Sequence, residues 1–167
     1  KNGGESSLVS SVAVYNEMLK RRPDLAEELC RPLYRDRRDE VPPGMEPWYR
    51  LAVFHFHKGY FSASIEPTYI GSAHRFEDVP EMTNRQKEAM RMSQALSEEL
   101  RFDTGFMRGD IQFCNNHVIF HTRRAFEDFD DPLRKRHLLR LWLKALDGRP
   151  LPAAFYERHG TVKSIDR

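Results

Sequence analysis

The stretch that decides the fold runs from Gly109 to Leu143 and reads GDIQFCNNHVIFHTRRAFEDFDDPLRKRHLLRLWL. Its apolar residues fall into two groups, the first at Ile111, Phe113 and 118–120 and the second over 138–143. Apolar runs rich in β-branched and aromatic residues predict strands, and the acidic, proline-containing residues between them predict a connection. We therefore expect two strands joined by a loop.

Side chains that are difficult to bury accompany these two predicted strands. His121 stands at the end of the first strand, and Arg136 and Arg140 stand at the second. A guanidinium beside apolar strands needs an anionic partner, and a neutral imidazole in such a place can serve as a metal ligand. Two simpler interpretations stay open, because a strand-end histidine is often only hydrogen-bonded or exposed, and arginine-rich connections are commonly solvated.

Several blocks of the sequence resemble one known family. They are G-D-x-Q-F-x-N-N-x-x-x-x-H-x-R-x-A-F-E-D at 109–128, R-x-R-H-L-L-R-L-W-L at 134–143, GGESSLVSS at 3–11 and YIGSAHRFEDVPEMTNRQKEAM at 69–90. The chain resembles, over nearly its whole length, the taurine-dioxygenase-like (TauD/TfdA-like) family of non-haem Fe(II)- and 2-oxoglutarate-dependent oxygenases. This resemblance implies a mainly β fold with flanking helices, a double-stranded β-helix or jelly roll.

The resemblance also implies a domain organisation. Residues 1–167 would form a single oxygenase domain that lacks its N-terminal part. A helical cover would span about 10–31, and the distal block for metal and 2-oxoglutarate would span about 104–145. In this family an H-x-D/E pair of metal ligands lies upstream of the glycine motif at 3–4, and no histidine of this chain is followed two residues later by Asp or Glu. We therefore expect the chain to be incomplete at its N-terminus.

Site roles follow from the resemblance, residue by residue. His121 matches the distal histidine that ligates iron, and Arg136 matches the arginine that pairs with the distal carboxylate of 2-oxoglutarate, for which a planar guanidinium is suited. Ser6 matches a hydroxyl that helps to hold the same cosubstrate. Arg140 matches an arginine that reaches the substrate or supports the cosubstrate, and on a strand it would share a face with Arg136. A salt bridge to a nearby carboxylate is the alternative for Arg140.

Three further residues lie close to His121 in the sequence. The amides of Asn115 and Asn116 either orient the metal site as outer hydrogen-bond partners or end a strand in a turn, and the sequence favours neither. Arg123, two residues beyond His121, shares its strand face and lies either near the iron or on the surface as a solvated charge.

The implied reaction is the oxidation, typically a hydroxylation, of a small organic substrate by dioxygen, with release of succinate and CO2 from 2-oxoglutarate. The cofactor is Fe(II), and an anionic or zwitterionic substrate suits Arg140. Because the proximal H-x-D/E pair is absent from this chain, the alternative is a non-catalytic jelly-roll binding module or an inactive fragment. A third interpretation is a cupin-like metal enzyme that uses His55, His57 and His121.

The composition argues against several other classes of protein. The chain has 167 residues, 27 basic and 25 acidic, for a formal net charge of +2, and this even mixture predicts no nucleic-acid surface. No apolar run approaches the ~20 residues that span a membrane, so we expect a cytoplasmic protein without a membrane partner. Cys30 and Cys114 are too few for a disulfide framework and are predicted to be small core residues. Assembly into a homo-oligomer stays open.

Local signals predict the other elements. Apolar spacing indicates helices over 10–19 and 24–29, and the charged, Pro- and Gly-rich stretch 35–47 indicates a surface loop. Lys58-Gly59 indicates a hairpin turn between strands. Thr83, with Gln86 three residues later, is a capping box that begins a further helix.

Overall fold

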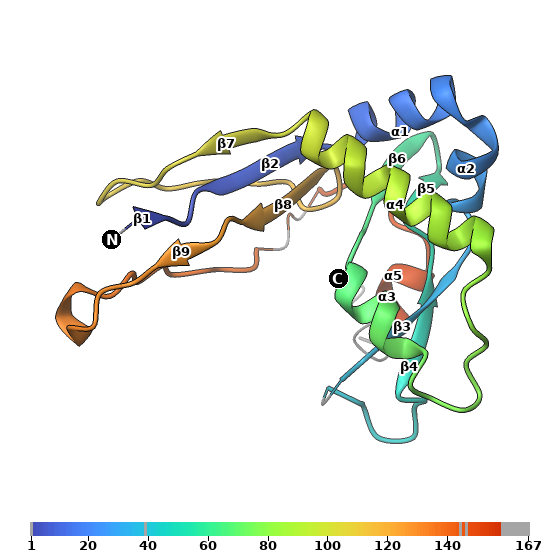
Figure 1. Ribbon diagram of the computed structural model, residues 1–167. Coiled ribbons are helices and arrows are strands. Elements are labelled where there is room, and N and C mark those ends of the chain that lie inside the picture. The colour runs from blue at the N-terminus through green and yellow to red at the C-terminus, as the bar shows by residue number, and fades with distance from the viewer. Residues whose placement is uncertain (1, 39, 144, 146, 158–167) are drawn as a thin grey trace.

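The computed structural model describes residues 2–38, 40–143, 145 and 147–157. Its elements follow in the order β1 (Asn2–Gly3), β2 (Ser6–Ser10), α1 (Ser11–Arg21), α2 (Pro23–Glu28), β3 (Leu33–Asp36), β4 (Trp48–Leu51), β5 (Phe54–His57), β6 (Tyr60–Ala63), α3 (Pro67–Ala73), α4 (Asn84–Glu99), β7 (Phe102–Thr104), β8 (Ile119–Arg123), β9 (Phe126–Glu127), the 3-10 helix η1 (Pro132–Arg134) and α5 (Ala154–Glu157). The strands form antiparallel sheets with the orders β1-β9, β7-β2-β8, β3-β4 and β5-β6. Figure 1 shows β7, β2, β8, β1 and β9 as an arm that projects from a body containing the helices and the other two sheets.

Helices α1 and α4 begin at residues whose side chains cap them, and α2 begins with a proline. The Ser10 hydroxyl accepts a hydrogen bond from the Ala13 N–H at the start of α1, and Pro23 occupies the first turn of α2. At α4 the Gln86 N–H donates to Thr83 Oγ1 while the Thr83 N–H donates to Gln86 Oε1. The side-chain caps of α1 and α4 each contribute about 1 kcal/mol. The predicted helices and the predicted capping box are confirmed.

The hydrophobic core lies in the body and reaches the base of the arm. Its largest fully buried apolar side chains are Phe54, Met18, Leu25, Leu29, Leu51, Ile70, Leu96, Val14 and Val53. Val9 of β2 and Phe120 of β8 belong to the same cluster. Burial of a side chain of this size contributes roughly 1.5–3 kcal/mol, so the packing of Val9 and Phe120 anchors the arm to the body.

The β5-β6 hairpin forms as its turn residues predict. Lys58 and Gly59 have φ values of +49° and +80°, the left-handed pair that a two-residue type I′ turn requires. His57 pairs with Tyr60 directly across this turn. The predicted hairpin is therefore confirmed.

The predicted surface loop over 35–47 is wrong for its first two residues. Arg35 and Asp36 belong to β3 and are fully buried. The guanidinium of Arg35 donates to the carbonyls of Ala52 and Ser64 at 2.9 and 2.7 Å, and Asp36 accepts a hydrogen bond from Arg75 Nε at 3.0 Å. A charged strand residue can be buried only with such partners, and the local sequence does not reveal them.

Of the two predicted strands, the first forms only in its last part, as β8, and the second does not form. The segments 111–113 and 138–143 have no strand geometry, and their side chains face solvent, with Phe113 and Leu139 exposed to 83% and 87%. A strand persists when a neighbour completes its backbone hydrogen bonds and another layer covers its apolar face. Among the described residues neither segment has a strand partner.

The expected fold class is met only in part. Helices and small antiparallel sheets share the described chain, and no sheet closes into a barrel among the described residues. The jelly roll is therefore not seen. The expectation for the cysteines is also met only in part, because Cys30 packs beside the core whereas Cys114 is exposed.

Candidate functional site

One face of the arm brings together residues from both ends of the sequence. In the β2–β8 ladder Ser6 lies opposite Arg123 and Leu8 lies opposite His121. Directly opposed residues share a face of an antiparallel sheet, as do residues two apart on one strand. Ser6, His121 and Arg123 therefore lie on the same face, although more than 110 positions separate Ser6 from His121 in the sequence.

The opposite face of this sheet turns toward the core. Val9 pairs with Phe120, and both side chains are buried. Ser7, on the same side, is buried and donates a hydrogen bond to Asp103. The sheet thus packs on the body with one face and leaves the face of His121 open.

His121 has the properties of a neutral imidazole. Its Nε2 donates to Asn116 Oδ1 at 3.0 Å, and with the amide in this orientation the free electron pair is on Nδ1. Desolvation lowers the pKa of His121, and the positive charge of Arg140 lowers it further. The side chain keeps an exposed edge. A neutral, accessible imidazole nitrogen of this kind can ligate a metal ion at neutral pH.

The two asparagines before β8 have different contacts. Asn115 Oδ1 accepts the N–H of His117, and the Asn115 carbonyl accepts the N–H groups of Val118 and Ile119. Asn116 instead contacts His121. Asn115 therefore builds the turn that starts β8, and Asn116 holds the imidazole.

Gly3 and Gly4 are required by the close approach of β1 to β9. Their φ values are +76° and +83°, and a Cβ on Gly3 would lie 2.3 Å from the carbonyl oxygen of Ala125. Arg136 Nη2 donates to the Gly4 carbonyl at 2.9 Å, and the Arg136 N–H donates to Asp128 Oδ1 at 3.0 Å. The glycine pair therefore places one end of the chain against the guanidinium of Arg136.

The ring of Phe126 connects two arginines of the site. The guanidinium carbon of Arg123 lies 4.3 Å from the ring centroid, and that of Arg136 lies 5.7 Å from it. Sequence reasoning gave Phe126 no role. Strand alternation in the sequence could have indicated it. Arg123 lies on the same face as His121, and Phe126 begins the next strand.

Arg140 approaches the site without sharing a strand with Arg136. Its guanidinium carbon lies 6.0 Å from the Trp142 ring centroid, and its charge acts on His121. The prediction that Arg136 and Arg140 line one strand face is wrong, since no strand forms at 138–143.

Among the described residues, His55 and His57 do not form a metal-binding group with His121. His55 and His57 lie on β5, in the β5-β6 sheet, and His55 Nε2 is hydrogen-bonded to the Ala52 carbonyl at 2.9 Å. Within the described ranges, no group of three or more His, Cys, Asp or Glu side chains is placed to hold a metal ion. The structure therefore gives the cupin-like interpretation no support.

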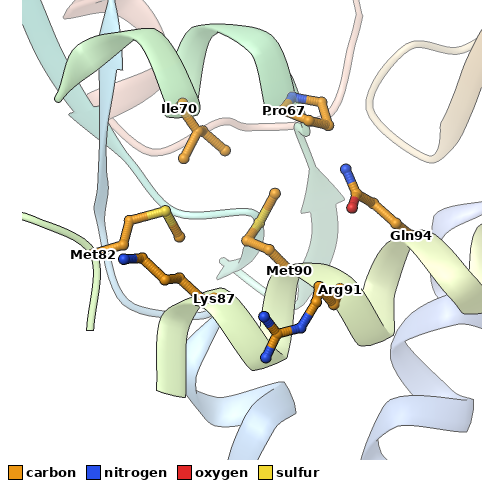
Figure 2. Close-up of a pocket in the computed structure, with 8 residues that line it drawn as sticks. Pro67, Ile70, Met82, Lys87, Met90, Arg91 and Gln94 are labelled. Atoms are coloured by element: carbon orange, nitrogen blue, oxygen red, sulfur yellow. The ribbon is translucent and has the colours of Figure 1, made fainter. Parts of the chain in front are cut away.

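A surface hollow elsewhere in the molecule offers different chemistry. It has a volume of about 260 Å³ and lies between α3 and α4, with Met82, Met90 and Ile70 on its wall and Lys87 and Arg91 at its rim (Figure 2). None of its lining residues is a histidine, cysteine or carboxylate. The arm, with His121, therefore remains the candidate site.

Comparison with known proteins identifies the class and then the family. Two relatives carry enzyme names: FR-33289 synthase of Streptomyces rubellomurinus is 31% identical over an alignment of 173 positions, and taurine hydroxylase-like protein SAT17 of Stachybotrys chartarum is 33% identical over 152. These names indicate an oxygenase-type enzyme. The model of the family "Taurine catabolism dioxygenase TauD, TfdA family" matches residues 1–142. The chain belongs to this family.

The alignments cover more of this chain than of the relatives. They include 98% of the chain and 50% of FR-33289 synthase, and 83% of the chain and 36% of the SAT17 protein. The chain thus spans about half the length of the first relative and less of the second. In the described part of the chain, no helix combines the length and the apolar character needed to cross a membrane.

Proposed function

We propose that this chain forms the distal part of an Fe(II)- and 2-oxoglutarate-dependent dioxygenase, which oxidises a small organic substrate with release of succinate and CO2. The observation that supports this most is the placement of His121 and Ser6 on one open sheet face, with Arg136 held nearby against the Gly4 carbonyl. Family membership supports the same chemistry.

The residues present fit part of the metal and cosubstrate set. A neutral imidazole at His121 suits ferrous iron, and a guanidinium at Arg136 without a carboxylate partner suits one carboxylate of 2-oxoglutarate. When bound, the iron with this cosubstrate supplies the oxidising power. Since the described residues hold no cluster of three ligands, we propose that the remaining ligands come from parts of the gene product outside the described residues.

The other site residues receive supporting roles in this proposal. The Ser6 hydroxyl, on the face of His121, helps to hold the cosubstrate. Asn116 fixes the rotation of the His121 ring through its hydrogen bond. Arg140 attracts an anionic or zwitterionic substrate, and its charge also keeps the imidazole neutral.

A non-catalytic binding module is the second candidate. The observation in its favour is that the described part of the chain contains no group of three or more His, Cys, Asp or Glu side chains placed to hold a metal ion. One imidazole binds ferrous iron too weakly for turnover. Such a module would still bind small anions through Arg136 and Arg140.

The experiment uses the complete reading frame that encodes this chain. With Fe(II), dioxygen, 2-oxoglutarate and a panel of small organic acids, we expect succinate formation that His121→Ala and Arg136→Ala abolish. Arg134→Ala is the matched control, because this guanidinium contacts only the Phe129 ring, at 3.8 Å, among the described residues. Full turnover in both site variants would contradict the assigned roles, and absence of turnover together with retained anion binding would favour the binding module.

A further inference from the structure

The surface hollow between α3 and α4 has apolar walls. Ile70 of α3 and Met90 of α4 line it from its two sides and are buried, and Met82 approaches from the segment between the two helices (Figure 2). Its volume of about 260 Å³ lies just below the roughly 300–1,000 Å³ of typical small-molecule sites. The hollow therefore has room for a single ring or a short chain.

Gly71 keeps part of this wall free of a side chain. It lies inside α3 (Pro67–Ala73) and lines the hollow. A Cβ at Gly71 would meet no described atom within 4 Å apart from those of its own helix, so close packing does not require glycine here. Glycine inside a helix is less stable than alanine. The glycine therefore costs helix stability and leaves space that the described part of the chain does not fill.

Two cations of α4 lie at the rim of the hollow. Lys87 and Arg91 are four residues apart and flank Met90 on one face of the helix, and like charges at this spacing destabilise a helix. Lys87 has an exposed acidic neighbour, Glu81, at 3.7 Å, whereas Arg91 makes no ion pair with any described residue. Because no lining residue is acidic, an anion at this rim would relieve the repulsion between the two cations.

The side chains of the wall indicate the kind of molecule that fits. Met82 and Met90 carry polarizable thioethers, which adapt to irregular apolar shapes and contact aromatic rings favourably. The Gln94 amide extends from α4 toward Pro67 of α3 (Figure 2), and an amide N–H can donate to an oxyanion. A thioether-rich wall below a cationic rim suits a ring that carries one acid group.

We propose that the surface hollow between α3 and α4 binds a small aromatic carboxylic acid. The ring lies against Met82 and Met90, and the carboxylate lies at the rim formed by Lys87, Arg91 and Gln94. A free small molecule fits better than a helix of a partner protein, because such a helix needs several anchors along a groove and the hollow has room for one. None of the lining residues belongs to the arm, so this inference does not rest on the proposed function.

The test is a titration of the complete gene product with benzoate, followed by NMR of isotope-labelled methionine methyl groups. We expect saturable shifts of the Met82 and Met90 resonances, which the variants Met82→Leu and Met90→Leu assign. The resonance of Met18 should stay in place, because Met18 is fully buried in the core and does not line the hollow. Benzamide, which has the same ring without the charge, should bind at least tenfold more weakly than benzoate.

Variants of the rim and of the wall test the two parts of the site. Arg91→Gln should weaken benzoate binding fivefold or more and leave benzamide binding within twofold. Arg85→Gln is the matched control, because Arg85 lies on another face of α4, where it pairs with Asp24 at 3.7 Å; it should change neither affinity by more than twofold. Gly71→Leu should abolish binding of both molecules by filling the hollow, and Gly71→Ala should retain it.

Several outcomes would overturn the inference. They are an absence of Met82 and Met90 shifts with benzoate, equal benzoate affinity in Arg91→Gln and the unmodified protein, and benzamide binding as tight as that of benzoate. Tighter binding of hexanoate than of benzoate would likewise overturn the preference for a ring. Circular dichroism melts identify any variant that fails to fold, and if Gly71→Leu is one of them, the exposed substitution Arg91→Gln decides.

Discussion

The guanidinium of Arg136 donates a hydrogen bond of 2.9 Å to the backbone carbonyl of Gly4, across 132 positions of sequence. A Cβ on Gly4 would lie 3.6 Å from Arg136 Nε and 3.1 Å from Phe126 Cβ. The glycine therefore gives the guanidinium its place beside the ring. This contact joins the segment between β1 and β2 to the segment after η1, so the geometry of the site depends on β1.

A substitution at Gly3 should disturb this arrangement through its backbone. In Gly3→Ala the new Cβ meets the Ala125 carbonyl oxygen at 2.3 Å, and φ is +76°. The left-handed conformation alone costs roughly 1–2 kcal/mol for alanine, and the clash adds to it by displacing β1 from β9. We expect a lower free energy of unfolding in urea and weaker 2-oxoglutarate binding.

Gly44 provides the matched control for this substitution. It has the same φ of +76° with nothing within 4 Å of the new Cβ. Gly44→Ala should show the conformational penalty without any effect on 2-oxoglutarate binding. Equal losses of stability in the two variants would mean that the Ala125 contact is relieved without displacement of β1.

Substitutions of the two asparagines before β8 should have different effects. Asn116→Ala removes the acceptor of the His121 Nε2 proton, so the tautomer of the imidazole should change, as nitrogen NMR of the histidine side chains can measure. Loss of such an outer partner typically lowers metal affinity 10–100-fold. Asn115→Ala should lower stability, because its amide holds the turn, and should leave the His121 resonances in place. Unchanged His121 resonances in Asn116→Ala would contradict the contact.

Local signals in the sequence predict a large share of the helices and turns. Ser10, the Thr83–Gln86 pair and Lys58-Gly59 act within a few residues of themselves, so their structural consequences can be recognised without tertiary information. The spacing of residues two apart also indicated correctly that Arg123 shares a face with His121.

Features that depend on distant partners could not be predicted in this way. The burial of Arg35 requires carbonyls 17 and 29 positions away, so the charged segment resembled a surface loop. The apolar run at 138–143 has the composition of a strand, but the described residues offer it no pairing neighbour. The composition of a segment indicates which conformation it favours, but the conformation that it adopts depends on what packs against it.

Two histidines should lower the free energy of unfolding in mild acid. His55 and His117 contact the Phe155 ring of α5, at centroid distances of 4.7 and 5.6 Å. Burial lowers the pKa of both histidines, and the charges of Arg35 and Arg149 lower them further, while a hydrogen bond to the Ala52 carbonyl opposes this at His55.

The sign of the effect follows from these lowered pKa values. Below the ordinary value of 6.5 the unfolded chain binds protons that the folded chain does not. The contribution to stability is therefore complete above about pH 6.5 and falls as the pH decreases toward the folded-state pKa values. Urea unfolding between pH 5 and 8 should show this slope, and the double variant His55→Gln, His117→Gln should reduce it, while His121, whose pKa is also lowered, still contributes. An equally steep slope in the double variant would assign the effect to other groups.

Truncation of Arg35 should be the most damaging single change in the body. Its guanidinium is fully buried and donates to the Ser64 hydroxyl at 3.1 Å as well as to two carbonyls. Arg35→Ala leaves these acceptors unpaired in the core and opens a cavity, and breaking a buried charged network of this kind costs about 3–5 kcal/mol. Arg50→Ala is the control, because Arg50 lies exposed on the neighbouring β4 and contacts the Tyr34 ring; its loss should cost no more than about 1 kcal/mol. Urea unfolding at pH 7 compares the two variants, and similar losses would show that the buried guanidinium contributes no more than a surface cation.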